Sequence, residues 1–435
     1  MKKSQKVISL VMLFLSALAI EMVSMPAFAH GERAQMASLR MRTINWFDTE
    51  IFHAGTGERF HGEDIKMKIG DELLIKGKFV PSEWWPEHVN SVEDAVYLNV
   101  GVPGPRFIRI DSRINGVPMI RSTRLEFGKL YEYEVRLKAR MPGRFHAHSV
   151  LSIEGAGPII GPARWVDVTG NEEDFENSIT TMTGDTLNLE TYGIRIIIFW
   201  NVFWFIVALG WLGYWFRKRP TVMPRYIKTT ELGDDADSQL TMTDMIVSFL
   251  FFGGVLVATA TGYFVTQQLY PITTPLQTGK VEVPHKELDN SVSLEVLDAR
   301  YRIPGRSFKI TLNVTNNSPH PVQVGDYMSG GLRFINPVIL PGLTRADSHD
   351  LLSPDGLTVE TPVDWIQPGT TEKITIYADD AMWETQRLTS LIYDPDSRFA
   401  GMIFFYDPSG KHRYYQEIGG QMIPVFGEYQ ATPSI

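Results

Sequence analysis

Hydrophobic and polar residues alternate over short stretches in two separate parts of the chain. In the first part, runs such as "DIKMKIGDELLIKGKFV" (64–80) and "YEYEVRLKARMPGRFHAHSVLSI" (131–153) are bounded by Gly, Pro and Asn. In the second part, from about 291, "SFKITLNVTNN" and "GMIFFYD" repeat the pattern, with a helical turn expected within "ADDAMWETQRLTSLI". A period of two predicts strands with one buried face, and many short strands separated by turns are typical of a β-sandwich or barrel.

Two unbroken apolar segments lie between these parts. The first is "IIIFWNVFWFIVALGWLGYWF" (196–216) and the second is "MIVSFLFFGGVLVATATGYFVTQQ" (245–268). About 20 apolar residues in a helix cross a bilayer, and aromatic residues at the ends are typical of its interfaces. The connecting loop opens with the basic residues "RKRP", whereas the segment before the first helix is acidic. The positive-inside rule therefore places the loop in the cytoplasm and both β-rich parts outside.

The first 29 residues have the pattern of a secretory signal peptide. Three lysines precede the apolar run "VISLVMLFLSALAI", and "AFA" at 27–29 fits the small-residue rule for cleavage. An uncleaved anchor is the alternative, but a run of about 14 residues is short for a bilayer. Cleavage after Ala29 makes His30 the new N-terminal residue. Export agrees with the topology above, so we expect a bacterial inner or intracytoplasmic membrane protein with both soluble domains in the periplasm.

The fold class that follows is mainly β, with two β-sandwich or barrel domains joined by a two-helix transmembrane hairpin. The predicted parts are a signal peptide 1–29, an N-terminal domain 30–170, a linker 171–192, a first helix 193–216, a cytoplasmic loop 217–243, a second helix 244–268, a linker 269–290 and a C-terminal domain 291–435.

Composition excludes several kinds of chemistry. The 435 residues contain no cysteine, which excludes disulfides, zinc ribbons, iron–sulfur clusters and a blue-copper centre. Any metal must therefore be bound by nitrogen and oxygen. The formal net charge of -9, with no long basic patch, argues against nucleic acid as a partner. No acid/base pair, nucleophile or phosphate-binding loop suggests another chemistry.

A candidate metal site begins with two histidines one residue apart. His146 and His148 in "RFHAHSVLSIEGAGPIIGP" point to the same face of an extended chain. A mature chain that begins at His30 adds two donors, its α-amino group, with an unperturbed pKa near 8, and its imidazole. These residues offer up to four nitrogens, a set that favours copper. A surface or hydrogen-bonded role is the alternative for each histidine.

Three further histidines lie in loop-like stretches. His53, His61 and His88 could supply a second metal site, although solvated loop histidines are the preferred interpretation.

Longer motifs resemble a known family. "HGERAQ", "LRMRTINWFD", "WWPE", "NVGVPGPRFIR", "LKARMPGRFHAHSVLSIEGAGPIIGP", "YPITTPLQTG", "YRIPGRSFKITLNVTNN" and "LIYDPDSRFAGMIFFYD" resemble the B subunit of the copper membrane monooxygenases. That family contains particulate methane monooxygenase and ammonia monooxygenase. The resemblance runs from His30 almost to the C-terminus.

The resemblance implies two cupredoxin-like domains, two membrane helices and two partner subunits, A and C, with a higher oligomer of that three-subunit unit. It also implies that His30, His146 and His148 bind copper. Some members carry further histidines at the positions of Asn45 and Val80, so we do not predict a copper site there.

We therefore expect the copper-binding subunit of a complex that uses O2 to hydroxylate a small gaseous substrate. The segment "LIYDPDSRFAGMIFFYD" favours methane over ammonia as that substrate. Whether oxidation occurs at this copper or in a partner subunit does not follow from the sequence. The alternatives are a membrane-anchored copper carrier, or a scaffold whose copper only stabilises the fold.

Overall fold

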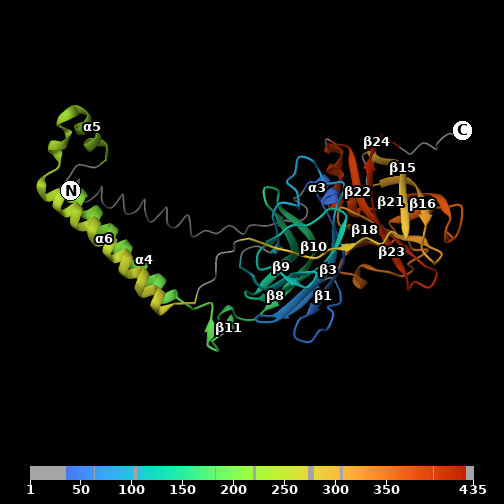
Figure 1. Cartoon of the computed structure of the whole chain (residues 1–435), viewed down its shortest axis with the longest axis horizontal. Coiled ribbons are helices and arrows are strands. Elements are labelled where there is room, and N and C mark those ends of the chain that lie inside the picture. Colours follow the sequence, from blue (N-terminus) through green and yellow to red (C-terminus); the bar gives the residue numbers. More distant parts are fainter. Residues whose placement is uncertain are drawn as a thin grey trace. The chain divides into compact units, whose positions relative to one another are not determined.

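A computed structural model describes residues 36–62, 64–101, 105–181, 183–218, 222–272, 279–303, 307–394 and 396–427 (Figure 1). The predicted signal peptide and His30 lie outside the described residues. The chain divides into two compact units. Residues Glu176–Leu276 form one unit, and the segments before and after it together form the other.

The first β-domain is a sandwich of two sheets. One sheet has the order β1-β3-β8-β5-β6, with β14 also pairing with β8, and the other has the order β13-β7-β4-β9-β10-β2. Its strands are β1 Ile44–His53, β2 Asp64–Lys68, β3 Glu72–Pro81, β4 Val96–Gly101, β5 Phe107–Ile114, β6 Val117–Pro118, β7 Ser122–Thr123, β8 Lys129–Ala139, β9 Gly143–Ile153, β10 Gly157–Thr169, β13 Lys280–Val281 and β14 Lys286–Glu287. Alternate residues of β3 and β8 are buried, as the period-two pattern predicted, and they fill the core between the sheets.

The second β-domain is also built from two sheets. They have the orders β20-β21-β16-β15-β24 and β19-β18-β17-β22-β23. The strands are β15 Val292–Ile303, β16 Ser307–Asn316, β17 Gln323–Ser329, β18 Leu332–Ile335, β19 Leu351–Ser353, β20 Leu357–Glu360, β21 Thr371–Asp379, β22 Arg398–Tyr406, β23 Arg413–Gln421 and β24 Ile423–Phe426. The predicted helical turn is confirmed as α7 Met382–Thr385 and a 3-10 helix Leu388–Tyr393.

The two β-domains share an apolar core, which is why they form one compact unit. Every residue of β17 is buried, and so are all but the first of β22, so this sheet is covered on both faces. Phe47 of the first domain packs against Phe404 of the second, with ring centroids 5.4 Å apart, in a cluster that also contains Val80, Met328 and Met402. The sequence indicated two domains but gave no sign of this shared core.

A short helix, α3 Ala37–Arg42, precedes the first domain in the chain but packs into the second. Ala37 and Met41 belong to the core of the second domain. The fully buried Arg42 side chain forms an ion pair with Asp394 at 3.2 Å and donates to the backbone carbonyl of Trp84 at 3.0 Å. The start of the described chain therefore connects both domains.

The second compact unit contains two long apolar helices, α4 Ile194–Lys218 and α6 Met242–Leu269, which confirms the predicted helix pair. They pack side by side: the rings of Trp211 and Phe251 stack at 4.2 Å, and Tyr214 donates to Asp244 at 2.7 Å. In the most apolar stretch of α4 no residue is buried within this chain, and in the most apolar stretch of α6 only 6% of the residues are buried. This excludes the buried core helix of a soluble domain, and the length and composition suit a bilayer.

The segments expected as linkers and loop carry some regular structure. A hairpin of β11 Ser178–Thr180 and β12 Thr186–Asn188 lies before α4, and α5 Val222–Leu232 with a 3-10 helix Gly233–Gln239 lies between α4 and α6. After α6, β13 and β14 add to the sheets of the first domain. Strands of two residues are too short for an alternating pattern to reveal them in the sequence.

Candidate metal centre

The predicted histidine pair lies on β9, in the middle of a sheet of the first domain. Arg144, His146 and His148 are at alternate positions, so they share one face of the strand. On the neighbouring strand β10, Asp167, Trp165 and Ala163 lie directly opposite them, in that order. The structure therefore brings the two predicted histidines together and surrounds them with a defined set of neighbours.

The ring of His148 is held by a backbone carbonyl group. His148 is 3% exposed, and its Nδ1 lies 3.1 Å from the carbonyl oxygen of Gly161. A carbonyl oxygen only accepts, so this hydrogen bond requires a proton on Nδ1. In the neutral ring Nε2 then carries the lone pair that can accept a bond. Histidines that bind metals are commonly held in this way, with the other ring nitrogen donating to a carbonyl or carboxylate.

A β-bulge in β10 places that carbonyl. The register of β9 and β10 shifts between Ile160 and Ala163, where Gly161 and Pro162 together lie opposite the single residue Ser149. A Cβ atom on Gly161 would lie 2.9 Å from the indole of Trp46 and 3.1 Å from the carbonyl oxygen of Ser149. Only glycine allows this close approach, and bulges of this kind often aim groups toward functional sites.

Small residues flank His148 on both sides. On β4 its partner is Gly101, and on β10 its partner is Ala163. A side chain at Gly101 would lie 2.8 Å from a methyl group of Val150 and 3.6 Å from the Cβ of His148. The cross-strand partners of His148 on both neighbouring strands are therefore small residues.

The two rings have a relative orientation that suits one metal ion. Their centroids are 4.6 Å apart, and their planes are 81° from parallel. With metal–nitrogen bonds of about 2.0 Å and about 1.1 Å from nitrogen to ring centre, two imidazoles at about 90° around a metal have centroids roughly 4.5 Å apart. The separation and orientation of the two rings are therefore compatible with both imidazoles binding one metal ion, for which all-nitrogen donors would favour copper.

The other histidines considered in the sequence do not complete a site among the described residues. His30 lies outside them. His53 ends β1, His61 lies in the loop before β2, and His88 lies in the loop between β3 and β4. Across the described part of the chain, no group of three His, Cys, Asp or Glu side chains is arranged to hold a metal ion.

The positions at which some members of the resembling family carry histidines hold other groups here. Asn45 and Val80 lie opposite each other in β1 and β3. Asn45 donates to the Glu417 carboxyl at 3.0 Å, and the backbone N–H of Glu83 donates to its other oxygen at 3.1 Å. Burial raises the pKa of Glu417 to about 7. A neutral amide and an apolar side chain thus occupy this interface between the domains.

One histidine that the sequence did not single out lies at the junction of the two domains. His349 is 2% exposed, and its Nδ1 accepts a hydrogen bond of 3.2 Å from the backbone N–H of Ile51. Burial, assisted by the charges of Arg59 and Arg164, lowers the pKa of His349 to about 3. The ring stays neutral and joins the domains. The motif "DSHD" around it offers no periodic or spacing signal that could have identified this role.

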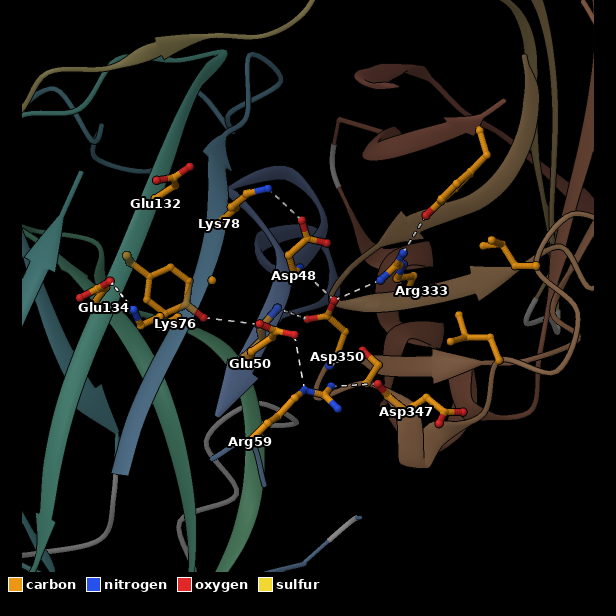
Figure 2. A pocket seen from close by; sticks show the side chains of 17 residues that line it. Asp48, Glu50, Arg59, Lys76, Lys78, Glu132, Glu134, Arg333, Asp347 and Asp350 are labelled. Atoms are coloured by element: carbon orange, nitrogen blue, oxygen red, sulfur yellow. Dashed lines mark hydrogen bonds and ion pairs between the residues drawn. The ribbon is translucent and has the colours of Figure 1, made fainter. Parts of the chain in front are cut away.

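A cavity of about 710 Å3 also opens between the two domains (Figure 2). Its wall carries many charges, among them Asp48, Lys78, Arg333 and Asp350. Figure 2 shows Asp350 between Asp48 and Arg333. Asp350 accepts from the backbone N–H groups of Asp48 and Thr49, both at 2.9 Å, and from Arg333 at 3.4 Å.

These charges are paired with one another. Asp48 binds Lys78 at 3.2 Å and accepts from Arg413 at 2.8 Å, and Arg333 also donates to Asp326. Burial alone would raise the pKa of Asp48, but the hydrogen bonds and charge of Arg413 hold it below its usual value. The cavity contains no histidine of the β9 pair. We therefore interpret this wall as the polar part of the domain interface.

Comparison with known proteins identifies relatives of the whole chain. A sequence model of the monooxygenase B-subunit protein family matches residues 31–426. The chain is 40% identical over 415 residues to the "Particulate methane monooxygenase alpha subunit" of Methylococcus capsulatus (strain ATCC 33009 / NCIMB 11132 / Bath). That match covers 95% of this chain and 96% of the relative.

Among solved structures, the cupredoxin domain of amoB from Nitrosocaldus yellowstonii matches 33% of this chain and 98% of its own, at 17% identity. Its TM-score is 0.23. A protein of unknown function from Porphyromonas gingivalis W83 covers 86% of this chain at 8% identity, with a TM-score of 0.18. Scores this low do not establish a shared fold.

Proposed function

Because the chain belongs to the monooxygenase B-subunit family, we propose that it is the copper-binding subunit of a membrane-bound complex that hydroxylates methane. The complex would insert one oxygen atom of O2 into the substrate and reduce the other to water. The relative that is 40% identical along nearly the whole chain is named as a methane monooxygenase subunit, which supports methane over ammonia. Its name also supports further subunits, for which we propose the A and C subunits.

The observation that carries the copper proposal is the arrangement of His146 and His148. Gly161 holds the His148 ring so that Nε2 has the lone pair, and the two rings stand nearly at right angles. We propose that the imidazole and α-amino group of His30 complete the donor set after cleavage of the signal peptide. Bound copper would supply a redox-active centre. The chain's own contribution is to fix the directions of the two β9 donors before the ion arrives.

For α4 and α6 we propose a transmembrane hairpin with its connecting segment in the cytoplasm and the β-domains in the periplasm. Both helices are long and apolar enough to cross a bilayer, and their apolar surface is exposed within this chain. An exposed apolar surface of this extent is unfavourable in water but suits lipid or the helices of partner subunits. Protease added to spheroplasts should digest both β-domains, and protection of the second domain would contradict this topology.

The function is tested on membranes that contain the complete complex. We expect O2-dependent conversion of methane to methanol, with ammonia oxidised less efficiently. Copper per chain should fall in a His146→Ala, His148→Ala double variant, while a His53→Ala, His61→Ala variant should retain it. Mass spectrometry should find His30 at the mature N-terminus.

Each alternative gives a different result. A copper-loaded complex that consumes neither substrate would identify a copper carrier. Oxidation that persists at the full rate after copper loss from this subunit would identify a scaffold. Unchanged copper content in the His146, His148 variant would place the ion elsewhere.

A further inference from the structure

Trp165 lies directly across from His146 on the neighbouring strand. The indole and imidazole centroids are 4.7 Å apart, and the ring planes are inclined by 30°. Trp165 is nevertheless 43% exposed, so core packing alone does not explain a side chain of this size at this position. We propose that Trp165 is a positioning residue that holds the His146 ring in the orientation required for copper. This inference rests on the proposed copper site.

The indole is itself held on its sheet by a charged group. The guanidinium of Arg144 lies 5.1 Å from the centre of the Trp165 ring, within the range of a cation–π contact. Arg144 is fixed in turn by Asp64, with bonds of 3.0 and 3.1 Å, and by Asp167 at 3.7 Å. Asp64 lies on β2, which pairs with β10 at Trp165. Three adjacent strands therefore contribute to the placement of this one aromatic ring.

A stacked indole restricts a motion that matters for a metal ligand. Rotation of a histidine ring about its outer side-chain bond is only weakly restricted by its own geometry. A half-turn would exchange Nδ1 with Cδ2 and Nε2 with Cε1, which turns the donor nitrogen away from the metal. His148 is fixed by the Gly161 carbonyl, whereas the His146 ring packs against the face of Trp165. Restricting the ring before the ion binds lowers the entropy that binding must remove.

A simpler role is that Trp165 only covers apolar surface. Tyr97 provides the matched control for that role. It lies on β4 of the same sheet and is 40% exposed, nearly the same as Trp165. If exposed aromatic residues on this sheet only cover its surface, replacing either of them should have the same consequences.

The experiment compares Trp165→Leu, Trp165→Phe and Tyr97→Leu in the full-length complex. Copper affinity is measured by competition with a chelator, and donor geometry by the nitrogen hyperfine pattern of Cu(II) in electron paramagnetic resonance. We expect Trp165→Leu to weaken copper binding between about twofold and tenfold, the range that one aromatic stacking contact supports. It should also alter the hyperfine pattern. Trp165→Phe retains a flat ring and should lie between wild type and Trp165→Leu, and Tyr97→Leu should match wild type.

A double-mutant cycle separates this inference from the copper proposal. In a His146→Ala background, Trp165→Leu should have no further effect on affinity, because the ring that it positions is gone. If His146→Ala itself leaves affinity unchanged, the copper site is wrong. If His146→Ala weakens binding but Trp165→Leu matches Tyr97→Leu in both measurements, only the positioning role is wrong. Should Trp165→Leu fail to fold, Trp165→Phe and Arg144→Met are expected to show the same spectral change to a smaller degree, and an unchanged spectrum in both would overturn the role.

Discussion

Each β-domain contains a pair of adjacent histidine rings, and the two pairs differ in geometry. In the first domain, His146 and His148 stand 4.6 Å apart with planes at 81°. In the second, His320 and His412 stack at 3.9 Å with planes only 14° apart. A metal ion lies close to the ring plane of each imidazole that binds it. Nearly parallel stacked rings share no such point, whereas rings at right angles do.

The partners of the rings reinforce this difference. The His148 Nδ1 bonds to a backbone carbonyl group, and only small residues lie beside the ring on the adjacent strands. In the second pair, His320 Nδ1 is hydrogen-bonded to the Tyr414 hydroxyl at 2.8 Å, and His412 Nδ1 lies 3.2 Å from the Asp407 carboxylate. The first pair has the orientation that our proposed copper site requires, and the second pair joins two loops. Proximity of two histidine rings is therefore not enough to propose a metal site, and ring orientation has to be considered as well.

Single substitutions give the largest expected contrast between the pairs. His148→Gln removes a donor from the crossed pair and should weaken copper binding on the order of 100-fold. His320→Gln should leave copper affinity within about twofold, because the stacked pair provides no shared site. Equilibrium titration of the complex with Cu(II) measures both. Equal losses in the two variants would remove the distinction that we draw from ring orientation.

His349 represents a third environment, a single buried ring at the domain interface. Its folded pKa of about 3 lies below the unfolded value of 6.5, so the unfolded chain binds more protons in that interval. The free energy of unfolding should therefore fall as the pH decreases from 6.5 toward 3, by about 1.5 kcal/mol between pH 6.5 and pH 5. Urea unfolding of the complex measures this loss.

The control for this loss is His349→Asn, which retains an acceptor for the Ile51 N–H. It should remove this part of the acid dependence and match wild type above pH 7.5. If the free energy of unfolding of the variant fell with decreasing pH as steeply as that of wild type, other groups would be the cause of the acid dependence.

Glu417, at the same interface, should make the free energy of unfolding fall as the pH rises, which is opposite to the effect of His349. Its folded pKa of about 7 lies above the unfolded value of 4.5, so the stability associated with its protonated form is lost as the pH rises through 7. We expect about 1 kcal/mol to be lost between pH 6 and pH 7. Glu417→Gln should remove this loss and raise the denaturation midpoint at pH 8. A lower midpoint at pH 8 would show that the ionised carboxylate stabilises the interface.

The smallest expected effect concerns stability, for which the second histidine pair should matter more than the first, the reverse of the order expected for copper affinity. Without copper, His320→Ala should destabilise the chain by about 1 kcal/mol, because the nearly buried Tyr414 hydroxyl loses its partner. His146→Ala should cost about half as much, since the loss of an aromatic contact at a partly exposed ring costs less than a buried hydroxyl left without its partner. Thermal unfolding of the copper-free complex tests this order. A larger cost for His146→Ala would indicate that the crossed pair also stabilises the fold.

The sequence predicted those features that depend on local pattern. Alternation in 64–80 and 131–153 predicted β2, β3, β8 and β9, and unbroken apolar runs predicted α4 and α6. Alternation also placed His146 and His148 on one face. Features that join distant segments were not predictable, because no local signal specifies the partner. The stack of Trp165 on His146 needs the register of β10 against β9, which the bulge at Gly161 shifts.

The shared core escaped prediction for a related reason. Every residue of β17 is buried, including Gln323, Asp326 and Ser329, so this strand shows no change of polarity that would indicate which face meets the first domain. Buried polar residues in such a strand find partners elsewhere, as Asp326 Oδ2 does in Arg333.

The placement of α3 has a consequence for the order in which the chain can mature. Arg42 and its partner Asp394 are separated by 352 positions, and Ala37 and Met41 complete a core whose other side chains begin at Val292. The apolar side chains of the first described helix to be synthesised thus lack the core that covers them until the last third of the chain has been made. Closing so long a loop is slow compared with forming local contacts. We therefore expect the contact between α3 and the second β-domain to be among the last to form as the chain folds.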